Sequence, residues 1–277
     1  QLSLYPPVYG ALRMRELIVE KMQEYRQLTW ATTEDVLVTN GSLHGIALVL
    51  ETMVQPNDTV ITDRFVYQGA VNKFSSAGAE IAIVDGDEDG MRMDALEEVL
   101  RELRTSNKSP KFIYTVPSPQ NPDGSIMPIE RRQKMLALAE EYDTLIFEDD
   151  CYIYQTLDIE TMPPAIVSLE GGRDRVIYIS TFSKIIGPGI RLGWMIANPS
   201  LLPRIAGYKQ DGGKDYLSSI IVTKYLKEHM ETRILELNEL LRRKRSAVVA
   251  ALRENFGPQL EVEEPSAGMF LWIQFPE

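Results

Sequence analysis

The chain has 277 residues, of which 44% are hydrophobic and 25% charged, and a formal net charge of −11. This composition fits one large globular domain plus part of another, and the acidic balance argues against nucleic acid, whose phosphates attract basic surfaces. A single cysteine, Cys151, excludes an internal disulfide and fits a reducing compartment. No apolar run approaches the roughly 20 residues of a membrane helix, and the start is not leader-like. We therefore expect a cytoplasmic protein that contacts neither nucleic acid nor membrane.

Apolar runs of strand length alternate with stretches of helical periodicity along the chain. Helices are expected at about 11–25, from a turn at 40–44 to 53, and at 67–76, 93–103, 129–142, 201–209, 220–230 and 232–255. Strands are expected at about 35–39, 59–61, 80–84, 112–116, 145–147, 176–179 and 194–197. Continuously apolar strands between helices predict a mostly parallel sheet covered on both faces. Ligands of such sheets bind beyond the carboxyl ends of the strands.

The segment after the strand at 176–179 combines hydroxyls, one lysine and, seven residues later, an arginine. At a strand end among apolar neighbours, Lys184 would lose part of its hydration, which favours the neutral amine that a nucleophile needs. Arg191, Thr181 and Ser183 suit a phosphate, because guanidinium matches phosphate oxygens with two parallel hydrogen bonds. A lysine that can form a Schiff base, next to residues that can bind a phosphate, suggests pyridoxal phosphate as the cofactor. Taken alone, Lys184 is equally a solvated surface charge.

The turn where the strand at 35–39 leads into a helix fits an anion site, although its residues by themselves favour an ordinary N-cap. Gly41 and Ser42 leave free backbone N–H groups beside the positive end of the helix dipole, which attracts an anion. The alternative is that Ser42 is an ordinary N-cap.

Three adjacent carboxylates, Glu148, Asp149 and Asp150, follow the strand at 145–147. They fit a metal site or a charged loop, but a metal site also needs ligands from converging elements, and none is apparent. We therefore predict no metal.

The S/T-x-x-K pattern ending at Lys184, with R-x-G-W downstream, resembles the cofactor loop of class I/II aminotransferases, the aspartate aminotransferase fold family (fold type I). Further segments match in order, namely Y-x-x-x-x-G from Tyr5, P-x-x-Q-N-P-x-G at 117–124 and D-[DE]-x-Y at 149–152. The segment at 265–273 resembles the family's P-x-G-G-M-F-x-W, a strand of the small domain, with Ala267 in place of the first glycine. The resemblance extends to Phe275 and implies an α/β fold with a mostly parallel sheet covered on both faces. It implies a large cofactor-binding domain at 1–230, and an interdomain helix with the start of a smaller α+β domain at 231–277.

The resemblance implies that pyridoxal 5'-phosphate is held by Lys184 as a Schiff base. Asp149 would pair with the protonated ring nitrogen, which makes the ring an electron sink, and Asn121 and Tyr152 would hydrogen-bond the phenolate oxygen. Tyr67 would stack on the ring. The implied phosphate ligands are Gly41, Ser42, Leu43, Thr181, Ser183 and Arg191, with Tyr5 supplied by the partner subunit of a homodimer. Ordinary packing roles are the alternatives for Tyr5 and Tyr67.

The predicted activity is transfer of an amino group between an amino acid and a 2-oxo acid, with Lys184 also acting as general base. Two alternatives stay open: another reaction on this scaffold, such as a lyase or decarboxylase, and a ligand-sensing domain of a transcription regulator. Aromatic, branched-chain, dicarboxylic and aminoadipate-like donors all fit. The arginine that binds the substrate carboxylate in this family is expected beyond residue 277. Asp150 is predicted to be structural, Cys151 a small buried residue, and the basic run 242–245 a solvated helix face.

Overall fold

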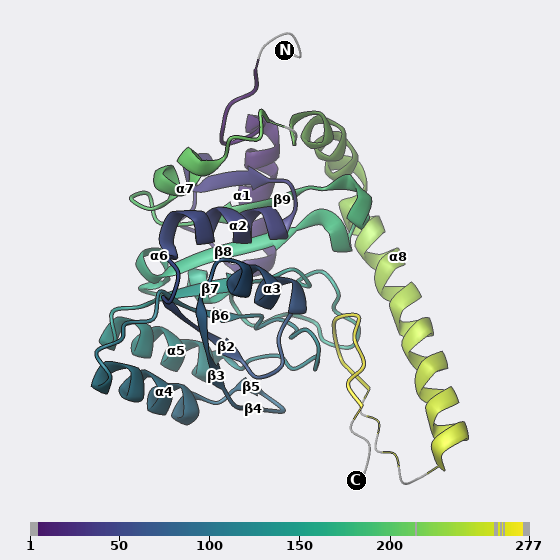
Figure 1. The fold of residues 1–277 in the computed structure, drawn as a ribbon. Coiled ribbons are helices and arrows are strands. Elements are labelled where there is room, and N and C mark those ends of the chain that lie inside the picture. Colours follow the sequence, from purple (N-terminus) through teal and green to yellow (C-terminus); the bar gives the residue numbers. More distant parts are fainter. Residues whose placement is uncertain (1–4, 214, 258–259, 261, 263, 274–277) are drawn as a thin grey trace.

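A seven-stranded sheet forms the centre of the structure (Figure 1), a computed structural model that describes residues 5–213, 215–257, 260, 262 and 264–273. In the order β1-β9-β8-β7-β6-β2-β3, the strands are Val36–Thr39, Gly193–Ile196, Val176–Thr181, Leu145–Asp149, Phe112–Thr115, Thr59–Asp63 and Glu80–Val84. β9 is antiparallel to both of its neighbours, whereas the other neighbouring pairs are parallel. The mostly parallel sheet predicted from the sequence is confirmed. A small separate hairpin, β4 (Gly86–Asp87) with β5 (Gly90–Met91), was not predicted, because its strands are too short to show a period.

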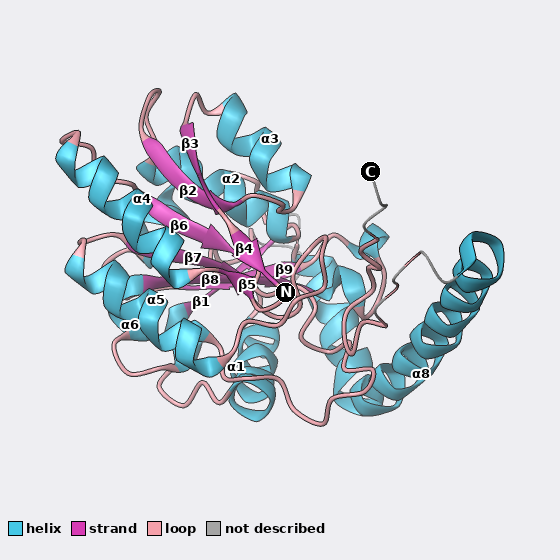
Figure 2. Cartoon of the chain, turned by 90° about the horizontal axis from the view of Figure 1, so that it is seen from below, coloured by secondary structure: helices cyan, strands magenta, loops and turns pink. Residues whose placement is uncertain are grey.

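Helices cover both faces of this sheet (Figure 2). One face packs against α2 (Ser42–Met53), α3 (Gln68–Ser76) and α7 (Leu202–Tyr208). The other packs against α1 (Leu12–Arg26), α4 (Met93–Thr105) and α5 (Ile129–Glu141), with the short α6 (Gly172–Arg175) beside α5. Successive strand residues join opposite clusters: Ile146 belongs to the α1 side and Phe147 to the α2 side. The strands are continuously apolar because both faces are buried.

The strand directions bring distant segments to one edge of the sheet. Thr39, which ends β1, and Thr181, which ends β8, both pair with Gly193, the first residue of β9. Since β9 runs against its neighbours, the residues that precede it lie at the same edge as the residues that follow β1 and β8. Asp149, which ends β7, is level with Ile179 of β8. This edge therefore carries the ends of β1, β7 and β8 together with the entry to β9.

The last long helix differs from the sequence prediction. Residues Tyr216–Phe256 form one continuous helix, α8, along one side of the molecule (Figure 1), where two helices had been expected at 220–230 and 232–255. The two-helix prediction was wrong because residues 230–232 are Met-Glu-Thr, without a glycine or proline to break the helix.

The basic run on α8 is also only partly the solvated face that was predicted. Arg242 donates to the Leu157 carbonyl at 2.6 Å and Arg245 to the Pro265 carbonyl at 2.8 Å, while Arg245 also pairs with Asp158. These two arginines therefore tie α8 to the loop after β7 and to the last described segment, and Arg243 and Lys244 are exposed.

The segment at 265–273 was expected to form a strand of the smaller domain, and that prediction was wrong. The segment makes an isolated bridge between Ala267 and Thr156, and it turns at Gly268, whose φ is 78°. An added Cβ at Gly268 would lie 2.7 Å from Cγ of Pro119, so the segment packs tightly on the 117–124 turn. Phe275, the end of the resemblance, lies outside the described residues.

Close packing of α2 on the sheet leads to a prediction about Gly45. A Cβ at this position would lie 2.3 Å from Cδ1 of Ile179 and 3.3 Å from Cε of Met195. Gly45→Ala is expected to lower the free energy of unfolding by about 1–3 kcal/mol, as overpacking does, in a urea titration. The control is Gly207→Ala in α7, where nothing lies within 4 Å of an added Cβ. It should stabilise by about 0.5–1 kcal/mol, because alanine is the better helix former. An unchanged stability in Gly45→Ala would contradict this close approach.

Candidate active site

Lys184 lies at the centre of the candidate site. It ends a short 3-10 helix, Phe182–Lys184, that follows β8 directly, and its side chain is half-buried. Its Nζ is 5.5 Å from the centre of the Tyr152 ring, and its backbone carbonyl accepts a hydrogen bond of 2.9 Å from Nε2 of Gln155. Residues that follow β7 and β8 are therefore in contact here.

Asp149 is the buried acid of the site, with only 3% of its surface exposed. Its two oxygens accept hydrogen bonds from the Tyr114 hydroxyl at 2.7 Å and from Sγ of Cys151 at 2.8 Å. Burial raises the pKa of Asp149 to about 6, whereas these two hydrogen bonds and the charge of Lys184 lower it. At neutral pH this side chain is a carboxylate that can hold a cationic N–H group.

Asn121 and Tyr152 form a pair that can hydrogen-bond one oxygen atom. Nδ2 of Asn121 donates to the Tyr152 hydroxyl at 2.9 Å. Gln120 holds the turn in place, because its Oε1 accepts from the Asn121 N–H at 3.0 Å and its Nε2 donates to the Phe65 carbonyl at 3.1 Å. Burial raises the pKa of Tyr152, so its phenol remains a donor. Sequence reasoning missed Gln120, although it belongs to the P-x-x-Q-N-P-x-G segment.

Tyr67 immediately precedes α3, and its ring folds back over the first turn of that helix. A Cβ at Gly69 would lie 2.4 Å from Cζ of Tyr67, so the ring can adopt this position only above a glycine. Burial raises the pKa of Tyr67, and the negative charge of Asp149 adds to the shift. The ring is half-buried and lies within electrostatic reach of Asp149.

We call the place where Arg191 meets the start of α2 the anion-binding corner, because a guanidinium and the N–H groups of a helix N-terminus would attract an anion. Gly41 has a φ of 80°, and a Cβ there would lie 2.6 Å from Nη2 of Arg191, so the guanidinium lies directly against this glycine. Arg191 is exposed and donates to the Asn40 carbonyl at 3.2 Å. Ser42 is the first residue of α2 and Gly41 its N-cap, with no side-chain capping bond. The alternative of Ser42 as an ordinary N-cap is therefore wrong.

Three of the remaining predicted phosphate ligands, Thr181, Ser183 and Leu43, lie beside this corner. Thr181 Oγ1 accepts from the Ser183 N–H at 3.1 Å and donates to the Leu192 carbonyl at 3.0 Å. Leu43 is half-buried in the first turn of α2. Tyr5 is 93% exposed, so the alternative of a packing tyrosine does not hold within the single chain.

Asp150 points to the opposite face of the sheet from Asp149. It accepts from Nε of Arg26 at 2.8 Å and from the Tyr178 hydroxyl at 3.1 Å. Arg26 and Asp150 are both fully buried, and Arg26 also donates to the Pro163 carbonyl at 2.6 Å. These contacts place Asp150 in a buried ion pair, as expected for a structural residue. Among the described residues, no group of three or more His, Cys, Asp and Glu side chains is arranged to hold a metal ion.

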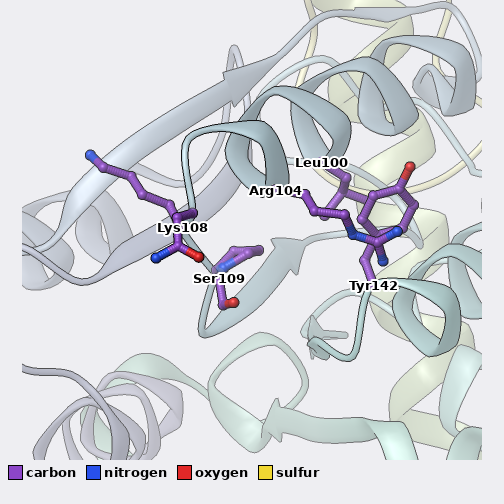
Figure 3. A pocket seen from close by; sticks show the side chains of 7 residues that line it. Leu100, Arg104, Lys108, Ser109 and Tyr142 are labelled. Carbon is purple, nitrogen blue, oxygen red and sulfur yellow. The ribbon is translucent and has the colours of Figure 1, made fainter.

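Among the described residues, a cavity and a hollow lie outside the immediate surroundings of Lys184. A small cavity of about 100 Å³ lies beside Arg104 and Tyr142 at the amino ends of β6 and β7 (Figure 3), where the Arg104 guanidinium stacks 3.9 Å from the Tyr142 ring centre. This is the opposite edge of the sheet from Lys184. A larger hollow of about 560 Å³ adjoins the anion-binding corner. It is lined by Asn40, His44, Gly189, Ile190, Arg191, Asp211 and Ser218.

Comparison with known proteins agrees with this arrangement. The family described as aminotransferase class I and II matches residues 1–277, and the chain belongs to this family. It is 32% identical over 276 residues to aromatic-amino-acid aminotransferase 1 of Thermococcus litoralis, a match that covers 99% of this chain and 66% of the relative. The chain therefore spans slightly less than two thirds of that relative's length.

Two solved structures have the same fold. The multiple substrate aminotransferase of Thermococcus profundus matches with a TM-score of 0.91 and 33% identity, covering 99% of this chain and 68% of the other. The α-aminoadipate aminotransferase of Thermus thermophilus, complexed with N-(5'-phosphopyridoxyl)-L-leucine, matches with a TM-score of 0.89 and 30% identity over the same shares of the two chains. The α/β fold of type I predicted from the sequence is thus confirmed. In the part of the chain that the structure describes, no helix is both long and apolar enough to cross a membrane.

Proposed function

We propose that this chain is a pyridoxal 5'-phosphate-dependent aminotransferase that moves an amino group between an amino acid and a 2-oxo acid. One observation carries the proposal: a half-buried lysine, a buried carboxylate and an arginine against a helix N-terminus converge at one edge of the sheet. Membership of the family and the phosphopyridoxyl compound bound to a structural relative support it.

The residues at this edge fit the cofactor, which has a phosphate, a basic ring nitrogen, a phenolate oxygen and an aldehyde. Because Gly41 has no Cβ, the guanidinium of Arg191 lies directly against it, next to the N-terminal N–H groups of α2, and both would attract the phosphate. We assign the phosphate to Gly41, Ser42, Leu43, Thr181, Ser183 and Arg191. Asp149 would hold the ring nitrogen, Asn121 and Tyr152 the phenolate oxygen, and Tyr67 the face of the ring.

When bound, pyridoxal phosphate supplies a carbonyl that condenses with amines and a ring that withdraws electrons from the substrate Cα. Nζ of Lys184 binds the cofactor and, when its amine is free, takes the proton from the substrate Cα as general base. Asp149 keeps the proton on the ring nitrogen by its negative charge. The substrates are an amino acid and a 2-oxo acid, and Lys184, Asp149 and Tyr152 are the catalytic residues of the proposal.

We further propose that the protein acts as a homodimer in the cytoplasm. The exposure of Tyr5 supports its use by a partner subunit, whose phosphate site it would contact. The large domain is assigned to residues 1–230, and the interdomain helix with the incomplete small domain to residues 231–277. On this assignment α8 crosses the boundary without a break.

An absorption spectrum tests the proposed function. Purified protein is mixed with pyridoxal phosphate, and aromatic, branched-chain, dicarboxylic and 2-aminoadipate donors are then added one at a time. A yellow band that bleaches with one donor, with release of the matching 2-oxo acid, is the expected result. A band that never bleaches would favour a ligand-sensing domain, and bleaching without 2-oxo acid would favour a lyase or decarboxylase. The absence of any band would contradict cofactor binding by this chain.

A further inference from the structure

The carboxylate of Asp149 accepts hydrogen bonds from two groups that sequence reasoning did not assign to the site. Tyr114 on β6 donates its hydroxyl to Oδ2 at 2.7 Å, and Cys151, two residues beyond Asp149, donates its thiol to Oδ1 at 2.8 Å. Tyr114 is fully buried, and its ring packs edge-on against Phe74 at 5.2 Å and Phe147 at 5.7 Å between ring centres. The tyrosine therefore has little freedom to move away from the carboxylate.

Both donors keep their protons. Burial and the nearby charge of Asp149 raise the pKa of the Tyr114 phenol and that of the Cys151 thiol above their ordinary values. Each group thus remains a donor in the neutral pH range, and a phenol is a stronger donor than a thiol. Since a carboxylate has about four acceptor positions, the two bonds leave positions free for a further N–H group.

We propose that Tyr114, assisted by Cys151, is a positioning residue that keeps the buried carboxyl of Asp149 ionised and fixes its plane toward the ring nitrogen of the cofactor. This inference rests on the proposed function. Burial by itself favours the neutral acid, which would leave the ring nitrogen without a counter-charge. Hydrogen bonds to the charged form oppose that tendency, and the Tyr114 bond is one of the two that act on Asp149 in this way.

The other ionisable groups that act on Asp149 come from several elements. Lys184, after β8, favours the carboxylate, whereas Asp150, the next residue along the chain, disfavours it. The Tyr67 phenol, at the start of α3, also lies within electrostatic reach. Substitution of Tyr114 leaves these groups unchanged, so the effect of its hydroxyl on the pKa of Asp149 can be measured separately.

The structure supplies a matched control. Tyr178, also fully buried, donates to the carboxylate of Asp150 at 3.1 Å on the opposite face of the sheet. Tyr114→Phe and Tyr178→Phe therefore each remove one buried phenol hydroxyl. In each case that hydroxyl donates a hydrogen bond to one of two adjacent aspartates. In both variants the aromatic ring remains to fill the core.

The first measurement is a carbon NMR titration of Asp149 in cofactor-free protein with ¹³Cγ-labelled aspartate, in which Asp149→Asn identifies the signal. A midpoint near 6 is expected for the unmodified chain. Tyr114→Phe should raise this midpoint by about one pH unit, the size expected for one hydrogen bond to a charged group. Tyr178→Phe should leave it in place. Cys151→Ala should raise it less than Tyr114→Phe does, and Cys151→Ser, which keeps a donor, should not raise it.

The second measurement is the pH profile of the enzyme loaded with pyridoxal phosphate. In Tyr114→Phe the acid limb of kcat should move toward higher pH, with KM for the amino donor unchanged. An unmoved Asp149 midpoint in a folded Tyr114→Phe variant, or an equal shift in Tyr178→Phe, would overturn the inference. If the unmodified chain fails to transaminate while the midpoint still moves in Tyr114→Phe, the proposed function fails and the control of Asp149 ionisation stands.

Discussion

Lys184→Ala is expected to abolish transamination, with a loss of at least about 10⁴-fold in kcat. The size follows from the two tasks assigned to Nζ, because covalent attachment and general-base proton transfer each contribute large factors. The anion-binding corner at Gly41 and Arg191 is intact in this variant, so pyridoxal phosphate should still bind, but without a covalent bond. Release of 2-oxo acid measures the activity, and retention of absorbance after exhaustive dialysis measures covalent attachment.

Two variants serve as controls for this prediction. Lys184→Arg keeps the positive charge near Asp149 but lacks a nucleophilic amine, so it should be as inactive as the alanine variant. Lys73→Ala removes an exposed lysine on α3 and should leave kcat unchanged. Turnover by Lys184→Ala near that of the unmodified chain would remove Lys184 from the reaction.

Asp149→Asn and Asp150→Asn are expected to fail in different ways, although the residues are adjacent. Asp149→Asn should lower kcat by about 10²–10³-fold, the usual scale for loss of a preorganised electrostatic group. Asp150→Asn should instead lower the free energy of unfolding by about 3–5 kcal/mol, because Arg26 would be left charged and unpaired in the core. Enzyme assays and urea titrations of both variants give the two values.

The stability of Asp149→Asn has a definite expected sign. Because burial raises the pKa of Asp149 to about 6 in the folded chain, the folded state binds a proton more readily than the unfolded state, and stability falls as pH rises toward that value. Removal of this charge should therefore leave stability at pH 7 unchanged or increased. Equal losses of activity in the two variants would mean that the pairing of Asp149 with the ring nitrogen is wrong.

The same pKa predicts the pH dependence of the unmodified chain. With a midpoint near 6, the ionised form of Asp149 outnumbers the neutral form by about ten to one at pH 7 and is outnumbered by about the same ratio at pH 5. In cofactor-free protein, binding of pyridoxal phosphate that requires the carboxylate should weaken as pH is lowered through 6, and a binding titration of Asp149→Asn should lack this dependence.

Local patterns in the sequence determined much of the fold. Runs such as 176–179 and 145–147 were predicted to be buried strands, and β8 and β7 contain them. Asp149 is the last residue of β7, and Lys184 is the third residue after β8, close to the strand ends where the sequence predicts them. The prediction of a mostly parallel sheet rested on apolar runs of strand length between helices, because strands covered on both faces are predominantly apolar.

Contacts between segments that are distant in sequence could not be predicted from local patterns. Arg191 precedes its strand, and it reaches the site edge only because β9 runs against β1 and β8, a direction that hydrophobic periodicity does not encode. The hydroxyl of Tyr114 on β6 donates to Asp149 on the neighbouring strand β7, although the two residues are 35 positions apart in sequence.

The different environments of Asp149 and Asp150 show this division most clearly. Alternation along a strand determines that the two side chains face opposite sides of the sheet. Only the packed structure determines that Arg26 pairs with Asp150 on one side of the sheet and that Lys184 lies near Asp149 on the other. Local sequence patterns therefore predicted the strands of the central sheet, their order along the chain and the residues near their ends. Which side chains meet there was decided by strand direction and packing, because those contacts join residues that have no local relation in sequence.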